Sequence, residues 1–551
     1  MSFFTWTSAQ QLLRQDDRPS IALPVDHAGT IKRRSVLAGG LGACLSLTAC
    51  GGGGSAASAG ASPQTQPPIT PIPPGQIDAA IAQLDELADN LMRRSNIPGM
   101  AIAVVRDGRT VYAKGFGVRR IGGGQAVDAN TVFQLASMSK PLGATAVAGA
   151  VGRGNVTWDT PVTTLLRDFK LSDDAVTRQV TVADFYSHRS GLPPQVADQL
   201  QVFGYDRPQI LERLRYVPLT GFRTQYAYTN YGMTAGAEAV ATAAGLDWET
   251  LVERTLYQPL GMTSSSSRYA DFLQRANRTS LHVKRDGRYQ ALYEQNADPQ
   301  SPAGGVSASV TDMAHWLTML MQNGTYDGRE VVKADALRPA ITAKMPITAT
   351  SAYGYGFVIT TSSSGRIKLQ HSGAFSQGAS TSFTAIPSVG VAIVTLTNTE
   401  PRGVPETMNA TFEDLVEFGY STRDWYPYQV SLTDPMYQPS GSLAGQQPPA
   451  QPVAALGDNA YVGVYANDYY GDAVVEPGDS GLLLKMGPGG VTTYVLRHWS
   501  GNTFVFDVNQ DVGRVDFEPD ASGLSTRLQF DAFTEDIARG EFVRTTQPHA
   551  E

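Results

Sequence analysis

The sequence Phe133-Gln134-Leu135-Ala136-Ser137-Met138-Ser139-Lys140 places a serine and a lysine three residues apart. On a helix this spacing puts both side chains on one face, one turn apart. A serine hydroxyl is a weak nucleophile unless a base accepts its proton, and burial can lower the pKa of a lysine enough to make it that base. Pro141 is typical of the first turn of a helix, so we expect Ser137 at or near a helix N-terminus. There the helix dipole favours developing negative charge.

Two further tripeptides are candidates to complete this site. Tyr228-Thr229-Asn230 offers a phenol and an amide, and His371-Ser372-Gly373 ends a strand-like run. Both patterns also arise elsewhere in the chain, as Tyr465-Ala466-Asn467 and His27-Ala28-Gly29. Ser-x-x-Lys is itself expected about once by chance in a chain of this length. The order of the three motifs is therefore more informative than any one of them.

In that order the motifs resemble the serine β-lactamase and penicillin-binding-protein superfamily, in the branch of class C β-lactamases, D-aminopeptidases and esterases. Family-like segments surround the motifs, at Phe133-Gln134-Leu135-Ala136, Ser187–Pro193, Pro259–Met262 and Pro302–Val306. The resemblance spans about residues 77–425. It implies an α+β domain in which an antiparallel sheet with flanking helices adjoins an all-helical region.

The resemblance also implies roles for the first two motifs. Ser137 is the nucleophile that becomes acylated, and Lys140 and Tyr228 share the proton transfers, with either of them as the base. Asn230 positions the lysine and the substrate amide. Water then hydrolyses the acyl-enzyme, so the implied reaction needs no metal or organic cofactor.

The third motif supplies His371 and Gly373. The backbone N–H groups of Ser137 and Ala374, the residue after Gly373, form the implied oxyanion hole. β-Lactamases of this branch carry lysine where this chain has His371, and a histidine neutral near pH 7 is a weaker anchor for a substrate carboxylate. Related carboxypeptidases and aminopeptidases tolerate histidine there.

This departure disfavours antibiotic resistance and favours an amide hydrolase. The expected substrates are peptides that contain D-residues or linearised cyclic peptides. Two alternatives stay open. The first is a carboxylesterase on the same site, and the second is a catalytically inactive lipoprotein that binds cell-wall fragments.

The composition excludes several other classes of protein. The chain has 551 residues, of which 42% are hydrophobic and 17% charged, as in an ordinary globular protein. A net charge of -8 argues against a nucleic-acid binder. Cys44 and Cys50 are the only cysteines, which excludes a disulfide framework and a four-cysteine zinc site.

The N-terminal segment has the pattern of a targeting signal. Lys32-Arg33-Arg34 precedes an apolar run, Val36–Leu47, which is too short to span a membrane as a helix. The arginines resemble a twin-arginine signal, and Leu47-Thr48-Ala49-Cys50 resembles a bacterial lipobox. This predicts a signal peptide over residues 1–49 and a lipid anchor on Cys50, although the cysteine can also be fortuitous within a plain signal peptide.

The predicted lipid anchor implies a place in the cell. We expect a protein of the bacterial cell envelope, on the periplasmic side. No aspartate follows Cys50, which favours the outer membrane. A low-complexity tether rich in Gly, Ser, Ala and Pro follows over residues 50–76.

The resemblance implies a serine hydrolase domain over residues 77–425. Composition and periodicity predict a Pro/Gln-rich linker over 426–454 and a small all-β sandwich or barrel over 455–546. In the first domain the pattern predicts helices and strands at Ile77–Leu91, Met100–Arg106, Arg109–Phe116, Tyr353–Thr361, Ile367–His371, Thr381–Ile386, Val391–Asn398 and Val404–Phe418. Strands from both ends of this domain should join one sheet.

Overall fold

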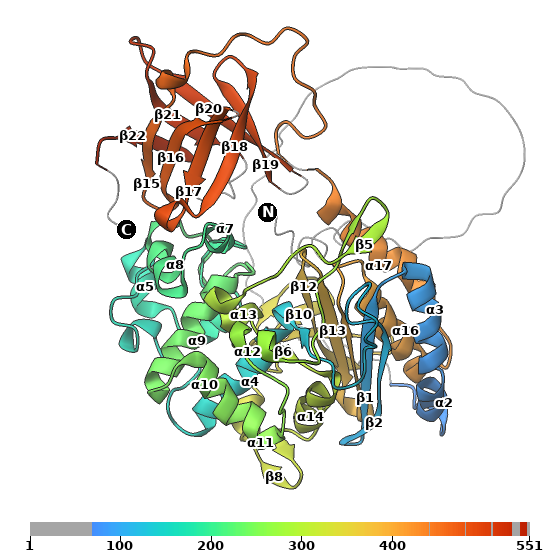
Figure 1. Cartoon of the computed structure of the whole chain (residues 1–551). Helices are drawn as coiled ribbons and strands as arrows, with labels where there is room; N and C mark the ends of the chain where they lie inside the picture. The colour runs from blue at the N-terminus through green and yellow to red at the C-terminus, as the bar shows by residue number, and fades with distance from the viewer. Residues whose placement is uncertain (1–68, 440, 480, 509–510, 532–539, 548–551) are drawn as a thin grey trace, which may run out of the picture.

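The computed structural model describes residues 69–439, 441–479, 481–508, 511–531 and 540–547 (Figure 1). The predicted signal peptide, Cys50 and most of the predicted tether lie outside the described residues. What is described forms an α+β domain and a C-terminal β-barrel, as the sequence predicts.

An eight-stranded antiparallel sheet organises the first domain. Its order is β2-β1-β14-β13-β12-β11-β10-β9. The strands are β1 (Gly99–Arg106), β2 (Arg109–Gly117), β9 (Met345–Pro346), β10 (Ser351–Tyr353), β11 (Val358–Thr361), β12 (Ile367–Phe375), β13 (Ala379–Ile386) and β14 (Val391–Thr397). β1 pairs with β14, so strands from the two ends of the domain lie side by side. Asp107 and Gly108 join β1 to β2 with positive φ angles of 49° and 73°, which a tight hairpin turn requires.

Helices cover both faces of this sheet. Met100, Ile102 and Val104 of β1 pack in one apolar cluster with α2 (Gln76–Ala82), α3 (Leu84–Ser95) and α16 (Val404–Phe418). The alternate residues of β1 belong to the larger core on the opposite face, which α14 (Val310–Met321) covers. A strand with both faces buried reads as a continuous apolar run, as this one does.

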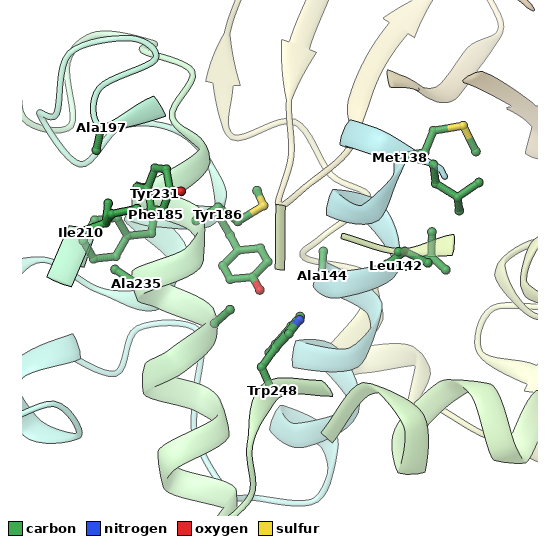
Figure 2. Packing of buried hydrophobic residues seen from close by; sticks show 14 of the residues in the cluster. Met138, Leu142, Ala144, Phe185, Tyr186, Ala197, Ile210, Tyr231, Ala235 and Trp248 are labelled. Atoms are coloured by element: carbon green, nitrogen blue, oxygen red, sulfur yellow. The ribbon is translucent and has the colours of Figure 1, made fainter. Parts of the chain in front are cut away.

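The helical region packs around α4 (Ser139–Gly152) and α9 (Asn230–Ala244). Figure 2 shows the rings of Tyr186 and Trp248 between these two helices, deep in the core. The other helices of the domain are α5 (Asp174–Gln179), α6 (Val182–Tyr186), α7 (Asp198–Val202), α8 (Arg207–Arg213), α10 (Trp248–Val252), α11 (Gln258–Leu260), α12 (Tyr269–Gln274), α13 (Ser301–Gly304) and α15 (Ala334–Leu337). Short strands β3 (Phe133–Gln134) and β6 (Ser307–Ala308) pair beside them.

The C-terminal domain is a closed antiparallel barrel, the second of the two predicted alternatives. Its strands are β15 (Gly463–Asn467), β16 (Gly471–Gly478), β17 (Gly481–Met486), β18 (Thr492–Ser500), β19 (Thr503–Val508), β20 (Asp511–Pro519), β21 (Ser525–Phe530) and β22 (Glu541–Thr545). β22 pairs with β15 and thereby closes the barrel. Helix α17 (Trp425–Thr433) occupies the beginning of the segment expected to be a linker.

Three of the predicted elements differ from the structure by more than two residues. The N-terminal helix is interrupted at Gln83, which separates α2 from α3. The strand predicted over Tyr353–Thr361 is two strands, because Gly356 turns the chain with a φ of 78°. β12 continues beyond His371 to Phe375, so the third motif lies within a strand and not at its end.

Candidate active site

Ser137 lies in a single 3₁₀ turn, Ala136–Met138, which leads directly into α4. Ala136 has a φ of 49°, a strained conformation for a residue other than glycine. Ser139 holds the turn in place: its Oγ donates to the carbonyl of Ala136 at 2.7 Å and accepts from the N–H of Val306 at 2.9 Å. Ser137 itself is only partly buried. The fold therefore presents this hydroxyl at the start of a helix, as expected.

The amine of Lys140 is fully buried and has three polar neighbours. Its Nζ lies 3.1 Å from Ser137 Oγ, 2.7 Å from Asn230 Oδ1 and 2.9 Å from the carbonyl oxygen of Ala303. The two carbonyl oxygens can only accept hydrogen bonds. A neutral amine, which has two N–H groups, satisfies both of them and turns its lone pair toward Ser137. The Lys140 amine therefore lies within hydrogen-bond distance of the serine hydroxyl, with two further acceptors for its N–H groups.

A buried carboxylate fixes the orientation of Asn230. The Nδ2 of Asn230 donates to both carboxylate oxygens of Asp198, at 3.1 and 2.9 Å. Because a carboxylate only accepts, the amide nitrogen must face Asp198 and the amide oxygen must face Lys140. Asp198 is 1% exposed and lies at the first position of α7. Sequence reasoning did not find this residue, since a lone Asp carries no motif.

Burial shifts the pKa values of Lys140 and Tyr228, the two titratable groups beside Ser137. It lowers the pKa of Lys140 to about 7, opposed by the negative charge of Asp198. Burial raises the pKa of Tyr228 well above its ordinary value, and a hydrogen bond to Ser137 opposes that rise. The amine lies 4.6 Å from the centre of the Tyr228 ring. Near neutral pH the lysine is thus partly deprotonated, whereas the tyrosine keeps its proton.

An aromatic cluster supports Tyr228 from behind. The ring of His188 lies 4.5 Å from that of Tyr228 and 4.6 Å from that of Tyr353. His188 Nδ1 accepts from the N–H of Thr229 at 3.2 Å, and its carbonyl accepts from the N–H of Ala227 at 2.8 Å. Burial lowers the pKa of His188 well below its ordinary value. His188 is therefore neutral, and its hydrogen bonds hold the segment that carries Tyr228 in place.

His371 faces this cluster from β12, and internal partners occupy both of its ring nitrogens. Nδ1 donates to the carbonyl of Ser372 at 2.7 Å, so Nε2 accepts from the hydroxyl of Tyr353 at 2.9 Å. Burial, together with the charge of Lys140, lowers the pKa of His371 to about 3. The side chain is a neutral part of the wall and provides no positive charge for a substrate carboxylate.

Gly373 brings the backbone of β12 directly against the turn that holds Ser137. A Cβ at Gly373 would lie 2.1 Å from the carbonyl oxygen of Leu135 and 2.9 Å from the backbone nitrogen of Met138. Thr381 Oγ1 also donates to the carbonyl of Leu135, at 2.7 Å. The next residue on β12, Ala374, is partly exposed. Only glycine permits this approach of the strand to the serine turn.

The structure thus brings all three motifs together around Ser137. It adds Asp198, Ser139 and the carbonyl of Ala303 to the polar groups that hold the serine and lysine. Of these, Ser139 and Ala303 lay in segments that the sequence had singled out, whereas Asp198 did not. Cys50, the expected lipid-attachment residue, lies outside the described residues.

Models of known families match both domains. The Beta-lactamase family model matches residues 84–418, which is more than half of the chain. A second model, Domain of unknown function (DUF3471), matches residues 447–543, the region of the barrel.

Curated relatives are named as hydrolases of several kinds. An unguisins hydrolase from Aspergillus violaceofuscus is 26% identical over 75% of this chain and 80% of its own length. A D-alanyl-D-alanine-carboxypeptidase/endopeptidase from Escherichia coli is 23% identical over 60% of this chain and 88% of its own length. An esterase from Burkholderia gladioli is 30% identical, but over only 34% of this chain and 52% of its own length.

Among solved structures, the octameric penicillin-binding protein homologue from Pyrococcus abyssi has a similar fold. The TM-score is 0.53 at 16% sequence identity, over 84% of this chain and all of that one. At this identity the likeness concerns the fold alone.

Proposed function

The chain belongs to the beta-lactamase family and is a serine hydrolase, and we propose that it cleaves amide bonds of peptides through an acyl-enzyme on Ser137. The observation that carries this proposal is the placement of Lys140. Its two carbonyl neighbours occupy the N–H groups of the neutral amine and leave the lone pair for the serine hydroxyl.

Acylation begins with transfer of the Ser137 hydroxyl proton to the neutral amine of Lys140. The serine oxygen then forms a bond to the substrate carbonyl carbon, and the carbonyl oxygen gains negative charge. The backbone N–H groups of Ser137 and Ala374 stabilise that charge, and one such donor contributes about 2.7–4 kcal/mol in comparable enzymes. The preference for Lys140 as the base follows from its pKa of about 7, beside a tyrosine that stays protonated.

Tyr228 completes the proton transfers. The C–N bond of the substrate breaks as the phenol donates its proton to the leaving amine, and Lys140 returns a proton to the phenolate. A water molecule then attacks the ester carbonyl of the acyl-enzyme. Its proton passes to the Lys140–Tyr228 pair, and Ser137 leaves with a proton as the hydroxyl.

The proposed substrates are peptides that contain D-residues or linearised cyclic peptides. Similarity to a D-alanyl-D-alanine-carboxypeptidase/endopeptidase supports the first class. The neutral state of His371 disfavours substrates that need a cation at that position, as β-lactamases with lysine there provide. A carboxylesterase on the same site is the second candidate, which the similarity to the Burkholderia esterase favours.

Matched chromogenic substrates distinguish these candidates. We would measure kcat/KM for D- and L-aminoacyl p-nitroanilides and for p-nitrophenyl butyrate, with Ser137→Ala as the control. Turnover of an amide at a rate approaching that of the ester supports a peptidase, and the ratio for D and L substrates reports the preferred chirality. Cleavage of the ester with no cleavage of either amide would replace this proposal with the esterase.

We also propose that the protein acts in the bacterial cell envelope, anchored to the outer membrane through lipid on Cys50. The lipobox-like sequence supports this. In the described part of the chain, none of the helices has the length and apolar character needed to cross a bilayer. Processing that is blocked by globomycin, with partition into detergent, would support the anchor. A water-soluble product whose N-terminus is not Cys50 would contradict it.

A further inference from the structure

The short helix α7 lies between the barrel and the catalytic residues, below the end of the barrel in Figure 1. One end of this region touches the site through Asp198, which orients Asn230. The last residue of α7, Val202, and the residues that follow it contact the barrel. The chain from 198 to 205 is therefore a direct physical connection between the two domains.

The barrel contacts residues 202–205 through hydrogen bonds and close backbone packing. The hydroxyl of Tyr205 donates to the carbonyl of Tyr470 at 3.0 Å, and Thr492 Oγ1 donates to the carbonyl of Val202 at 3.1 Å. Gly487 lies so near that a Cβ there would be 1.8 Å from the carbonyl oxygen of Phe203. Phe203, Tyr205 and Tyr470 are all at least 95% buried, and they belong to one continuous core shared by both domains. A contact of this kind is rigid and depends on shape.

On its other side, α7 supports both acceptors of the Lys140 amine. Asp198 holds the amide of Asn230, the first acceptor. Gln201 Oε1 accepts from Gln300 Nε2 at 2.6 Å, and Gln201 Nε2 donates to the carbonyl of Asn296 at 2.9 Å. These two contacts fix the chain that leads into α13, whose Ala303 carbonyl is the second acceptor.

We propose that the barrel is part of the catalytic apparatus: by docking on residues 202–205 it fixes α7, and Asp198 then acts as a positioning residue that holds Asn230 and, through it, Lys140. This inference rests on the proposed function, in which Lys140 is the base. It gives the barrel a role in turnover without any contact between the barrel and the substrate. Because a displacement of about 1 Å at a catalytic group can cost up to about 10²-fold in rate, small movements of α7 should be measurable.

Substitutions at Asp198 test the positioning role. Asp198→Ala removes the acceptor for Asn230, and we expect kcat to fall at least about tenfold with little change in KM. Asp198→Asn keeps an oxygen acceptor and should recover most of that loss. The titratable groups around Lys140 are Asp198, Tyr228, His188 and His371. Of these, Asp198 is the one whose charge raises the pKa of Lys140, so Asp198→Asn should move the acid limb of kcat/KM to lower pH. An unchanged kcat and an unchanged limb in both variants would overturn the role of Asp198.

Substitutions in the barrel test the docking role in the full-length protein. Gly487→Ala introduces a clash with Phe203, whereas Gly523→Ala is a matched control: the φ angles of the two glycines are 80° and 84°, but nothing lies within 4 Å of a Cβ at Gly523. Tyr205→Phe is a milder variant that removes only one hydroxyl. We expect kcat to fall for Gly487→Ala and, less, for Tyr205→Phe, but not for Gly523→Ala.

Hydrogen–deuterium exchange gives a readout that does not depend on turnover. Exchange should become faster at residues 198–205 and 228–232 in Gly487→Ala and stay unchanged in Gly523→Ala. If the Gly487 and Tyr205 variants lose thermal stability while kcat and exchange at 228–232 match the control, the barrel only stabilises the fold and the inference is wrong. Failure of the wild-type protein to hydrolyse any amide or ester would instead refute the proposed function, and the exchange result would still decide whether the barrel positions α7.

Discussion

The same three-residue pattern occurs once in each domain, with opposite consequences. Tyr228-Thr229-Asn230 leads into α9, whose first residue is Asn230. A cation lies over its tyrosine ring, the amine of Lys140 at 4.6 Å from the ring centre. Tyr465-Ala466-Asn467 lies in β15, and its tyrosine ring also has a cation over it, the guanidinium of Arg544 at 4.8 Å. Pattern and cation are therefore alike at the two places.

The two cations differ in what they can do. Arg544 donates to the carbonyls of Val462 and Ala460, at 2.7 and 3.2 Å, and to the hydroxyl of Tyr465 at 2.7 Å. An arginine keeps its proton in proteins, and its partners here are structural. Lys140 is able to lose its proton, and its third partner is the partly exposed hydroxyl of Ser137. A tyrosine–asparagine pattern therefore indicates chemistry only where it meets a deprotonatable group and a nucleophile.

Exchanging the two cations should produce the largest difference. In Lys140→Arg a base becomes a permanent cation, and we expect kcat/KM for p-nitrophenyl butyrate to fall by about 10³- to 10⁴-fold. In Arg544→Lys some hydrogen bonds are lost, so the protein should be about 2 kcal/mol less stable, with kcat unchanged. Circular dichroism checks that both variants are folded. Retention of near-full activity by a folded Lys140→Arg protein would contradict the role of Lys140.

Removing the two tyrosine hydroxyls should give the next largest difference. Tyr228→Phe removes a proton donor beside Ser137, and kcat should fall by about 10²- to 10³-fold. Tyr465→Phe removes a bond to the carbonyl of Tyr461, at 2.6 Å, and one from Arg544. Its expected effect is a lower melting temperature with kinetics like those of the wild type. Equal kinetic losses in the two variants would mean that Tyr228 has no chemical role.

The pH dependence of kcat/KM should report the protonation of Lys140. Because Lys140 has a pKa of about 7 and acts as a base, kcat/KM should rise about tenfold per pH unit below pH 7 and level off above it. His371, with a pKa of about 3, should add no limb between pH 4 and 7. The measurement is kcat/KM from pH 4 to pH 9. A flat profile below pH 7 would exclude Lys140 as the base.

The free energy of unfolding should also rise with pH because of Lys140. Unfolded chains keep a lysine protonated up to its ordinary pKa of 10.5, whereas folded Lys140 loses its proton near 7. Between these values the unfolded state binds more protons, so the free energy of unfolding of the wild type rises with pH relative to that of Lys140→Met. The expected slope is up to about 1.4 kcal/mol per pH unit. The difference in free energy of unfolding between the wild type and Arg544→Met, which keeps Lys140, should show no such slope in the same urea titrations at pH 7 and pH 9.

Much of the fold was predictable because its signals are local. The hairpin at Asp107-Gly108 and the helix Val404–Phe418 follow directly from turn chemistry and periodicity, and both ends of that helix match. The C-terminal domain was predictable only as a sandwich or a barrel, because the closing pair joins β15 to β22 at the two ends of the domain. Closure is a property of the whole sheet, which no single segment encodes.

The candidate site likewise has residues that local sequence patterns indicate and residues that only the fold brings into place. Ser137, Lys140 and Asn230 were predictable because their spacing is short and their order is specific. Asp198 was not, because its function comes from a contact across the fold, 32 residues from Asn230 in sequence. The neutral state of His371 was expected from its ordinary pKa, but the bond to its Nε2 comes from Tyr353 in β10, two strands away in the sheet.

The most direct test of the account is to identify the residue that becomes acylated. The full chain would be treated with a fluorophosphonate and digested, and the labelled peptide would be sequenced by mass spectrometry, in parallel with Ser137→Ala and Lys140→Arg. We predict one label per chain on Ser137, no label in Ser137→Ala and slow labelling in Lys140→Arg. A label on another residue, or equal labelling of the Ser137→Ala protein, would contradict the central claim that Lys140 activates Ser137 as the nucleophile.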